Sequence, residues 1–137
     1  MNYKIKLISI LFIASPVSLY AQKIYLGSCT TRDGGQYKGE MSGGKPNGKG
    51  TTIFKTGDTY EGSYLKGKRD GYGVYTFADG EKYEGQWTQD QQNGRGTYYF
   101  QNNNNYVGLW FRDYQHGHGI MYYYNHDKYD GDWYMDK

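Results

Sequence analysis

The sequence has little of what usually stabilises a small domain: one cysteine, two prolines and few aliphatic residues. Because Cys29 is the only cysteine, no intramolecular disulfide can form. Glycine and tyrosine are abundant instead, with 21 and 18 copies. A conventional core of leucine, isoleucine and valine is therefore not expected, and stability has to come from packing of other residues.

Residues 1–21 have the layout of a secretory signal peptide. Lys4 and Lys6 precede an apolar run, and a small residue, Ala21, closes the segment. The run is shorter than the ~18 to 20 residues needed to span a bilayer, so cleavage after Ala21 is favoured over a short membrane anchor. Lipidation at Cys29 is a further alternative, although that cysteine is separated from the apolar run. We expect a periplasmic, cell-envelope or secreted protein.

The net charge carries little functional information once the targeting segment is removed. The whole chain has 16 basic and 14 acidic residues, and two of the basic ones are Lys4 and Lys6. The remaining 14 basic residues balance the 14 acidic ones, so the exported chain is neutral. Nucleic acid is therefore not an expected partner.

The rest of the sequence repeats with a period of 23 residues. Each full copy begins with Tyr-x-Gly, and a Gly-x-Gly pair starts nine residues after the first glycine. Repeats of this length indicate a fold built from stacked copies of one supersecondary unit. The repeated positions are Tyr37, Gly39, Gly48, Gly50, Tyr60, Gly62, Gly71, Gly73, Tyr83, Gly85, Gly94, Gly96, Tyr106, Gly108, Gly117, Gly119, Tyr129 and Gly131.

This pattern resembles the MORN (membrane occupation and recognition nexus) repeat. The copy that begins at Tyr60, YEGSYLKGKRDGYGVYTFADG, has every fixed residue of the pattern. The resemblance extends over residues 27–137. It divides one domain, residues 22–137, into a half repeat at 27–36, full repeats at 37–59, 60–82, 83–105 and 106–128, and a half repeat at 129–137.

Four residues depart from the pattern. Asp90 and Asp113 replace the glycine in the middle of the repeat, and Asn103 and His126 replace the last glycine. Asparagine tolerates a positive φ better than most residues, so Asn103 is a mild change. His126 makes the last turn the least secure part of the pattern.

Residue alternation predicts a β-hairpin for each copy. Alternate side chains of a strand share a face, so Tyr60, Gly62 and Tyr64 point the same way. Since a lone hairpin is marginal in water, each copy depends on its neighbours. The predicted fold is all-β: one elongated, twisted antiparallel sheet of about ten strands, made of successive hairpins.

Glycine inside a strand indicates that another group approaches closely. The residue four positions after each repeat tyrosine is a methionine or an aromatic residue, and we expect a ladder of tyrosine and tryptophan rings over the glycines. An alternative is that these rings are exposed and stack on carbohydrate or lipid. The residues concerned are Met41, Tyr64, Trp87, Trp110 and Trp133.

No enzyme and no cofactor are predicted. The glycine pairs match neither a dinucleotide-binding nor a phosphate-binding motif, and no serine shares a copy with a histidine. His116 and His118 form the one histidine cluster, but His126 is predicted at the far end of the same strand. We therefore interpret the pair as polar residues of a hairpin tip and not as metal ligands.

Charge is unevenly distributed along the exported chain. Residues 23–69 contain nine basic and four acidic residues, whereas residues 70–137 contain five basic and ten acidic ones. Five basic residues of the first part lie in or near the first two predicted hairpin tips, which lie on one edge of the sheet. This candidate docking strip for an anionic partner comprises Lys45, Lys49, Lys66, Lys68 and Arg69.

The resemblance to MORN proteins implies either protein scaffolding or binding of anionic lipid. We predict a non-enzymatic scaffold that binds a protein partner, or associates with itself through the open edges of the sheet. The alternative is peripheral binding of anionic phospholipid through the basic tips.

Overall fold

The computed structural model describes residues 23–137. The predicted signal peptide and its cleavage site lie outside the described residues. Within the described part of the chain, no helix is long and apolar enough to cross a membrane.

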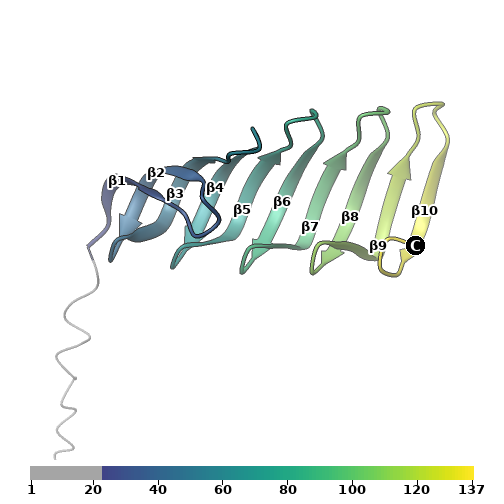
Figure 1. Ribbon diagram of the computed structural model, residues 1–137. Helices are drawn as coiled ribbons and strands as arrows, with labels where there is room; N and C mark the ends of the chain where they lie inside the picture. The colour runs from purple at the N-terminus through teal and green to yellow at the C-terminus, as the bar shows by residue number, and fades with distance from the viewer. Residues whose placement is uncertain (1–22) are drawn as a thin grey trace, which may run out of the picture.

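Ten antiparallel strands form one open sheet, in which each strand pairs with its neighbours in sequence. Figure 1 shows the strands side by side in chain order, joined by turns that lie alternately at the two ends of the strands. The predicted elongated sheet of hairpins is therefore confirmed. The strands are β1 (Tyr25–Thr30), β2 (Gln36–Ser42), β3 (Lys45–Ile53), β4 (Thr59–Leu65), β5 (Lys68–Thr76), β6 (Lys82–Thr88), β7 (Gln91–Tyr99), β8 (Asn105–Phe111), β9 (Tyr114–Tyr122) and β10 (Lys128–Trp133).

A row of glycines crosses the whole sheet, one from each strand. Within a hairpin Gly62 pairs with Gly73, and between hairpins Gly73 pairs with Gly85; the other strands repeat this register. The ring of Tyr60 lies over the row, and its hydroxyl donates to the Ser63 carbonyl at 2.9 Å. A Cβ atom on Gly73 would come within 2.2 Å of the Tyr60 hydroxyl oxygen. Only glycine lets the ring approach the backbone this closely.

Tyrosine and tryptophan rings alternate above this row. The Trp87 ring lies edge-on to Tyr60 of the preceding repeat, at 5.4 Å between centroids, and to Tyr83 of its own repeat, at 5.3 Å. Edge-to-face packing of this kind is the favoured geometry for aromatic pairs. Tyr60, Tyr83 and Tyr106 are completely buried. The predicted ladder is present, and the tyrosines in it are not exposed as a stacking platform would require.

The two departures at the last glycine keep the same turn. Asn103 and His126 adopt φ values of 64° and 70°, in the left-handed region that Gly80 also occupies. The His126 amide donates to the Tyr123 carbonyl at 3.0 Å, as the Gly80 amide donates to the Phe77 carbonyl at 2.9 Å. Tertiary context therefore holds even a histidine in this conformation.

Buried tyrosines should make the fold sensitive to alkali. Burial raises the pKa of Tyr37 and Tyr106 to about 12, and raises that of Tyr83 further. A phenol with a raised folded-state pKa stabilises the fold fully below its unfolded pKa of about 10, and this contribution is lost as the pH rises toward the folded pKa. We expect the free energy of unfolding, measured in urea, to decrease between about pH 10 and about pH 12. A free energy of unfolding that stays constant over that range would contradict the raised pKa of the buried tyrosines.

Candidate functional site

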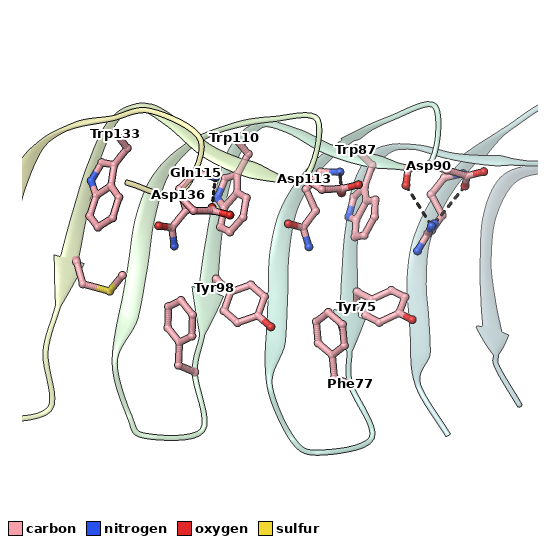
Figure 2. A pocket seen from close by; sticks show the side chains of 14 residues that line it. Tyr75, Phe77, Trp87, Asp90, Tyr98, Trp110, Asp113, Gln115, Trp133 and Asp136 are labelled. Atoms are coloured by element: carbon pink, nitrogen blue, oxygen red, sulfur yellow. Dashed lines mark hydrogen bonds and ion pairs between the residues drawn. The ribbon is translucent and has the colours of Figure 1, made fainter. Parts of the chain in front are cut away.

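A groove of about 700 Å³ runs along the aromatic face of the sheet, over β5 to β10. Figure 2 shows Trp87, Trp110 and Trp133 in a row along it, with Tyr75 and Tyr98 beside them. Phe77 and Phe100, near the turns of one edge, line the same groove. The rings of Tyr75 and Tyr98 pack against the buried core but are themselves only partly buried.

Carboxylates from the hairpin tips line the groove beside the tryptophans, on the side away from Phe77 (Figure 2). The amide of Gln92 donates to Oδ1 of Asp113 at 2.8 Å, and the Asp113 amide donates back to the Gln92 carbonyl at 3.0 Å. Gln115 and Asp136 form the same reciprocal pair at 2.8 and 3.0 Å. Each pair joins the tip of one repeat to the first residues of the return strand in the preceding repeat.

These bonds explain why aspartate replaces the mid-repeat glycine. Gly67, Asp90 and Asp113 occupy the same position in successive repeats, all with positive φ. Gly67 faces Pro46 and donates to its carbonyl at 2.8 Å, but proline has no amide hydrogen to donate in return. An aspartate side chain at 67 would have no backbone donor opposite it. Asp90 and Asp113 face residues that do have an amide hydrogen, and each carboxylate accepts a hydrogen bond from that amide.

Arg69 lies within the groove and not at a free tip. Its guanidinium carbon is 4.6 Å from the centroid of the Trp87 ring, and Nε is 3.2 Å from Oδ1 of Asp90. Its terminal nitrogen Nη2 also donates to the Asp90 carbonyl at 3.1 Å. The side chain is 17% exposed. The arginine is thus held between an aromatic face and a carboxylate.

A second row of polar residues joins the repeats at the strand ends that are connected by the longer turns. Asp58 accepts from the Tyr75 hydroxyl at 2.6 Å and from the Ala78 amide at 2.8 Å. The hydrogen bond from Tyr75 is the main reason why the pKa of Asp58 is lowered. Glu81 occupies the same position one repeat later and accepts from the Tyr98 hydroxyl. This row holds the two tyrosines in place along the groove.

Comparison with protein-family models identifies the repeat. A family model for the MORN repeat matches residues 37–59, 60–82, 83–105 and 106–128. The chain belongs to the MORN-repeat family. None of the curated proteins matches the chain. Among solved structures, the chain is similar to the TCP domain of SAS-4 (dCPAP) in complex with a proline-rich motif of Ana2 (dSTIL) of Drosophila melanogaster. The identity is 15%, over 79% of this chain and 90% of that one, with a TM-score of 0.24.

Of the remaining residues of the predicted docking strip, three lysines lie at the first two tips of the MORN array, and Lys49 lies within β3, opposite Ser63. Lys45, Lys49, Lys66 and Lys68 are exposed. A Cβ atom on Gly67, between the last two, would be 3.8 Å from Cδ of Lys45, so the two tips are adjacent. No ion pair engages any of these lysines within residues 23–137. The structure separates them from Arg69, and their binding of an anion stays a prediction.

The histidines of this MORN chain do not converge. His118 lies next to Asp130, with Nε2 2.9 Å from Oδ1. The ring of His116 packs instead between Phe111 and Tyr134, with centroids 5.6 and 5.3 Å away. In the part of the chain that the structure describes, no three potential ligands are grouped to hold a metal.

Sequence reasoning missed the groove and its carboxylate side. From the sequence, Asp90 and Asp113 are departures from the MORN pattern in the later hairpin tips, and neither Gln92 nor Gln115 is given a binding role. A signal was nevertheless present in the sequence. Gly67 faces a proline in the preceding repeat, whereas Asp90 and Asp113 face residues that have a backbone amide hydrogen.

Proposed function

We propose that this MORN-repeat protein is an exported, non-enzymatic scaffold that binds a segment of another protein along the groove. The supporting observation is the groove itself, with an aromatic floor over three repeats and a few polar groups at its side. Ligand sites typically have this composition, with apolar contact area for affinity and few polar groups for orientation. The composition of residues 1–21 supports export.

Selection from a displayed peptide library on the purified protein tests this function. We expect enriched peptides to quench or shift tryptophan fluorescence and to bind at least tenfold more weakly to Tyr98→Ala, which removes a partly buried ring from the groove. A matched control is Tyr72→Ala, because Tyr72 is 55% exposed and does not line the groove. Circular dichroism checks that both variants fold. Enriched peptides that are indifferent to Tyr98→Ala would overturn the proposal.

Peripheral binding of anionic phospholipid is the second candidate, favoured by four exposed lysines without an ion pair, at or near two adjacent tips. Each lysine near an anionic surface contributes about 1 kcal/mol. Changing Lys45, Lys66 and Lys68 together to glutamine should therefore weaken attachment to phosphatidylserine vesicles by about a hundredfold. Co-sedimentation over a salt series measures it, and attachment should also weaken with salt. Absence of binding at low salt would exclude this function.

Self-association is a further form of the scaffold role. Within the described residues, β1 and β10 each pair on one side only, and unpaired strand edges tend to pair with another chain. Tyr129, on β10, is 45% exposed, whereas its counterparts in the full repeats are buried. Light scattering at increasing concentration should show a mass above that of the monomer; a constant monomeric mass would contradict it.

A further inference from the structure

The groove contains three copies of one arrangement, in which a tryptophan and an aspartate lie side by side (Figure 2). The copies, here called aromatic-acid sites, are Trp87 with Asp90, Trp110 with Asp113, and Trp133 with Asp136. In the first of them the guanidinium of Arg69 lies over the indole ring and beside the carboxylate. Arg69 thus shows which chemical group this arrangement holds: a planar cation that stacks and forms an ion pair.

The three sites have the same geometry. The aspartate Oδ1 accepts from the backbone amide of the facing residue at 2.8 Å in each of them. The indole nitrogens of Trp87, Trp110 and Trp133 donate to glycine carbonyls at 3.3, 3.3 and 3.2 Å. Because both the carboxylate and the ring are fixed by equivalent bonds, the second and third sites present the same surfaces as the first.

Among the described residues, no cation of the chain itself reaches the second and third sites. The residue equivalent to Arg69 is Gln92 in one and Gln115 in the other, and neither Asp113 nor Asp136 forms an ion pair. Two carboxylates therefore face the groove without a counterion, beside indole faces that attract cations.

The two glutamines point to a ligand as well. Gln92 and Gln115 are only 7% and 6% exposed, and both line the groove. Figure 2 shows the Gln115 side chain directed into it, between Trp110 and Trp133. No hydrogen bond from the described residues reaches either side-chain amide, and neither amide is enclosed by protein, so both open onto the groove. An amide can both donate to and accept from a peptide backbone.

The spacing of the sites selects an extended peptide. Equivalent positions of neighbouring repeats are two strands apart, which is about 9.6 Å at ~4.8 Å per strand. Three residues of a polyproline II segment span about 9.3 Å, at ~3.1 Å per residue. Side chains at positions i and i+3 of such a segment point the same way, because it has three residues per turn.

We propose that the second and third aromatic-acid sites bind two arginine side chains, at positions i and i+3 of an extended segment of a partner protein. The inference rests on the proposed function and specifies its ligand. Each guanidinium stacks on Trp110 or Trp133 and pairs with Asp113 or Asp136, and the glutamine amides bond to the peptide backbone between them.

Calorimetric titration with synthetic peptides tests the proposal. The probe is the nine-residue peptide APRPPRPPA, compared with a peptide in which the arginines are four positions apart and with one that has glutamine at both positions. Since a hydrogen bond to a charged group contributes about 1.5 to 3 kcal/mol, each correctly placed arginine should strengthen binding about tenfold or more. We expect the i, i+3 peptide to bind most tightly and to weaken with salt.

Variants of the groove make the test specific. Gln92→Arg supplies an internal guanidinium to the second site, as Arg69 does in the first, and should weaken binding of the probe at least tenfold. Asp113→Asn keeps the oxygen that accepts from the Gln92 amide but removes the charge, and should cost about tenfold. The control Gln92→Met has nearly the same length as glutamine and no charge, so it should retain more affinity than Gln92→Arg.

A gain of affinity completes the design. Arg69→Gln should open the first site, so that a peptide with a third arginine three residues before the pair binds about tenfold more tightly to this variant than to the unaltered protein. Thermal melts check that each variant folds. If Gln92→Arg does not fold, Asp113→Asn still tests the second site.

Several results would overturn the proposal: no preference for the i, i+3 spacing, or affinities unaffected by Gln92→Arg and Asp113→Asn. The peptide-library selection distinguishes failure of the arginine proposal from failure of the proposed scaffold function. Groove-binding peptides without paired basic residues would leave the scaffold function in place and exclude this ligand. Selection of no groove-binding peptide would exclude both.

Discussion

Replacing Gly96 by alanine is expected to lower the free energy of unfolding by about 3 kcal/mol or more. The added methyl group would lie 2.3 Å from the Tyr83 hydroxyl oxygen and 2.5 Å from ring carbons of the same residue. That ring is completely buried and lies between Trp87 and Trp110, at 5.3 and 5.2 Å, so it has no space into which to move. Overpacking of a rigid site typically costs 1 to 3 kcal/mol and sometimes more. Equilibrium unfolding in urea measures the change.

Gly80→Ala is the matched control for this substitution. Gly80 has φ of +95°, and a Cβ atom there would meet nothing within 4 Å. Its replacement therefore tests backbone strain alone, which costs about 1 to 2 kcal/mol for a residue with a side chain. If Gly80→Ala destabilised the protein as much as Gly96→Ala, close approach of the tyrosine ring would not be the reason for the glycine row.

Tyr83→Ala should have the largest effect of the substitutions considered, about 4 kcal/mol. Tyr83 is completely buried, packs edge-on against two tryptophans and covers the glycine row of its repeat. Deletion of a buried aromatic ring typically costs 3 to 5 kcal/mol, because a cavity remains as well. Since every repeat is stabilised by its neighbours, we also expect the unfolding transition in urea to become less cooperative.

Two further variants separate the contributions within this effect. Tyr83→Phe removes only the hydroxyl that donates to the Gln86 carbonyl at 2.9 Å, and should cost about 1 kcal/mol. Tyr129→Ala removes the equivalent ring from β10, where the residue is 45% exposed and, among the described residues, packs edge-on against one ring, that of Trp133. Its cost should be clearly below that of Tyr83→Ala. Equal losses at the two positions would contradict the role assigned to packing from both sides.

The repeat positions are the part of the fold that could be predicted in detail. The 23-residue period locates each tyrosine and glycine, and alternation along a strand assigns them to one face. The register could not be predicted to the same extent, because it depends on which glycines face each other across strands. The structure shows that the tyrosine of the same hairpin covers each glycine pair, whereas the tryptophan packs between tyrosines of successive repeats.

The candidate site was less accessible to sequence reasoning. Arg69 was grouped with Lys66 and Lys68 because the three are close in the sequence. Its contacts, however, are Asp90, 21 residues later, and Trp87 on β6. Proximity in the chain cannot distinguish a free tip residue from one that the next repeat encloses. The lysines of the strip are exposed at or near the tips, and their binding of an anion stays a prediction.

The all-β class, the number and length of the repeats, and the positions of the repeated tyrosines and glycines follow from the sequence alone. These features repeat locally, so each copy provides independent evidence for the others. Which side chains face the groove follows from the stacking of the hairpins, since the aspartate of each aromatic-acid site is held by a backbone amide of the preceding repeat. Asp113 acquires its role from the amide of Gln92 in the preceding repeat and from Trp110 beside it, and such contacts between repeats exist only when the hairpins are stacked.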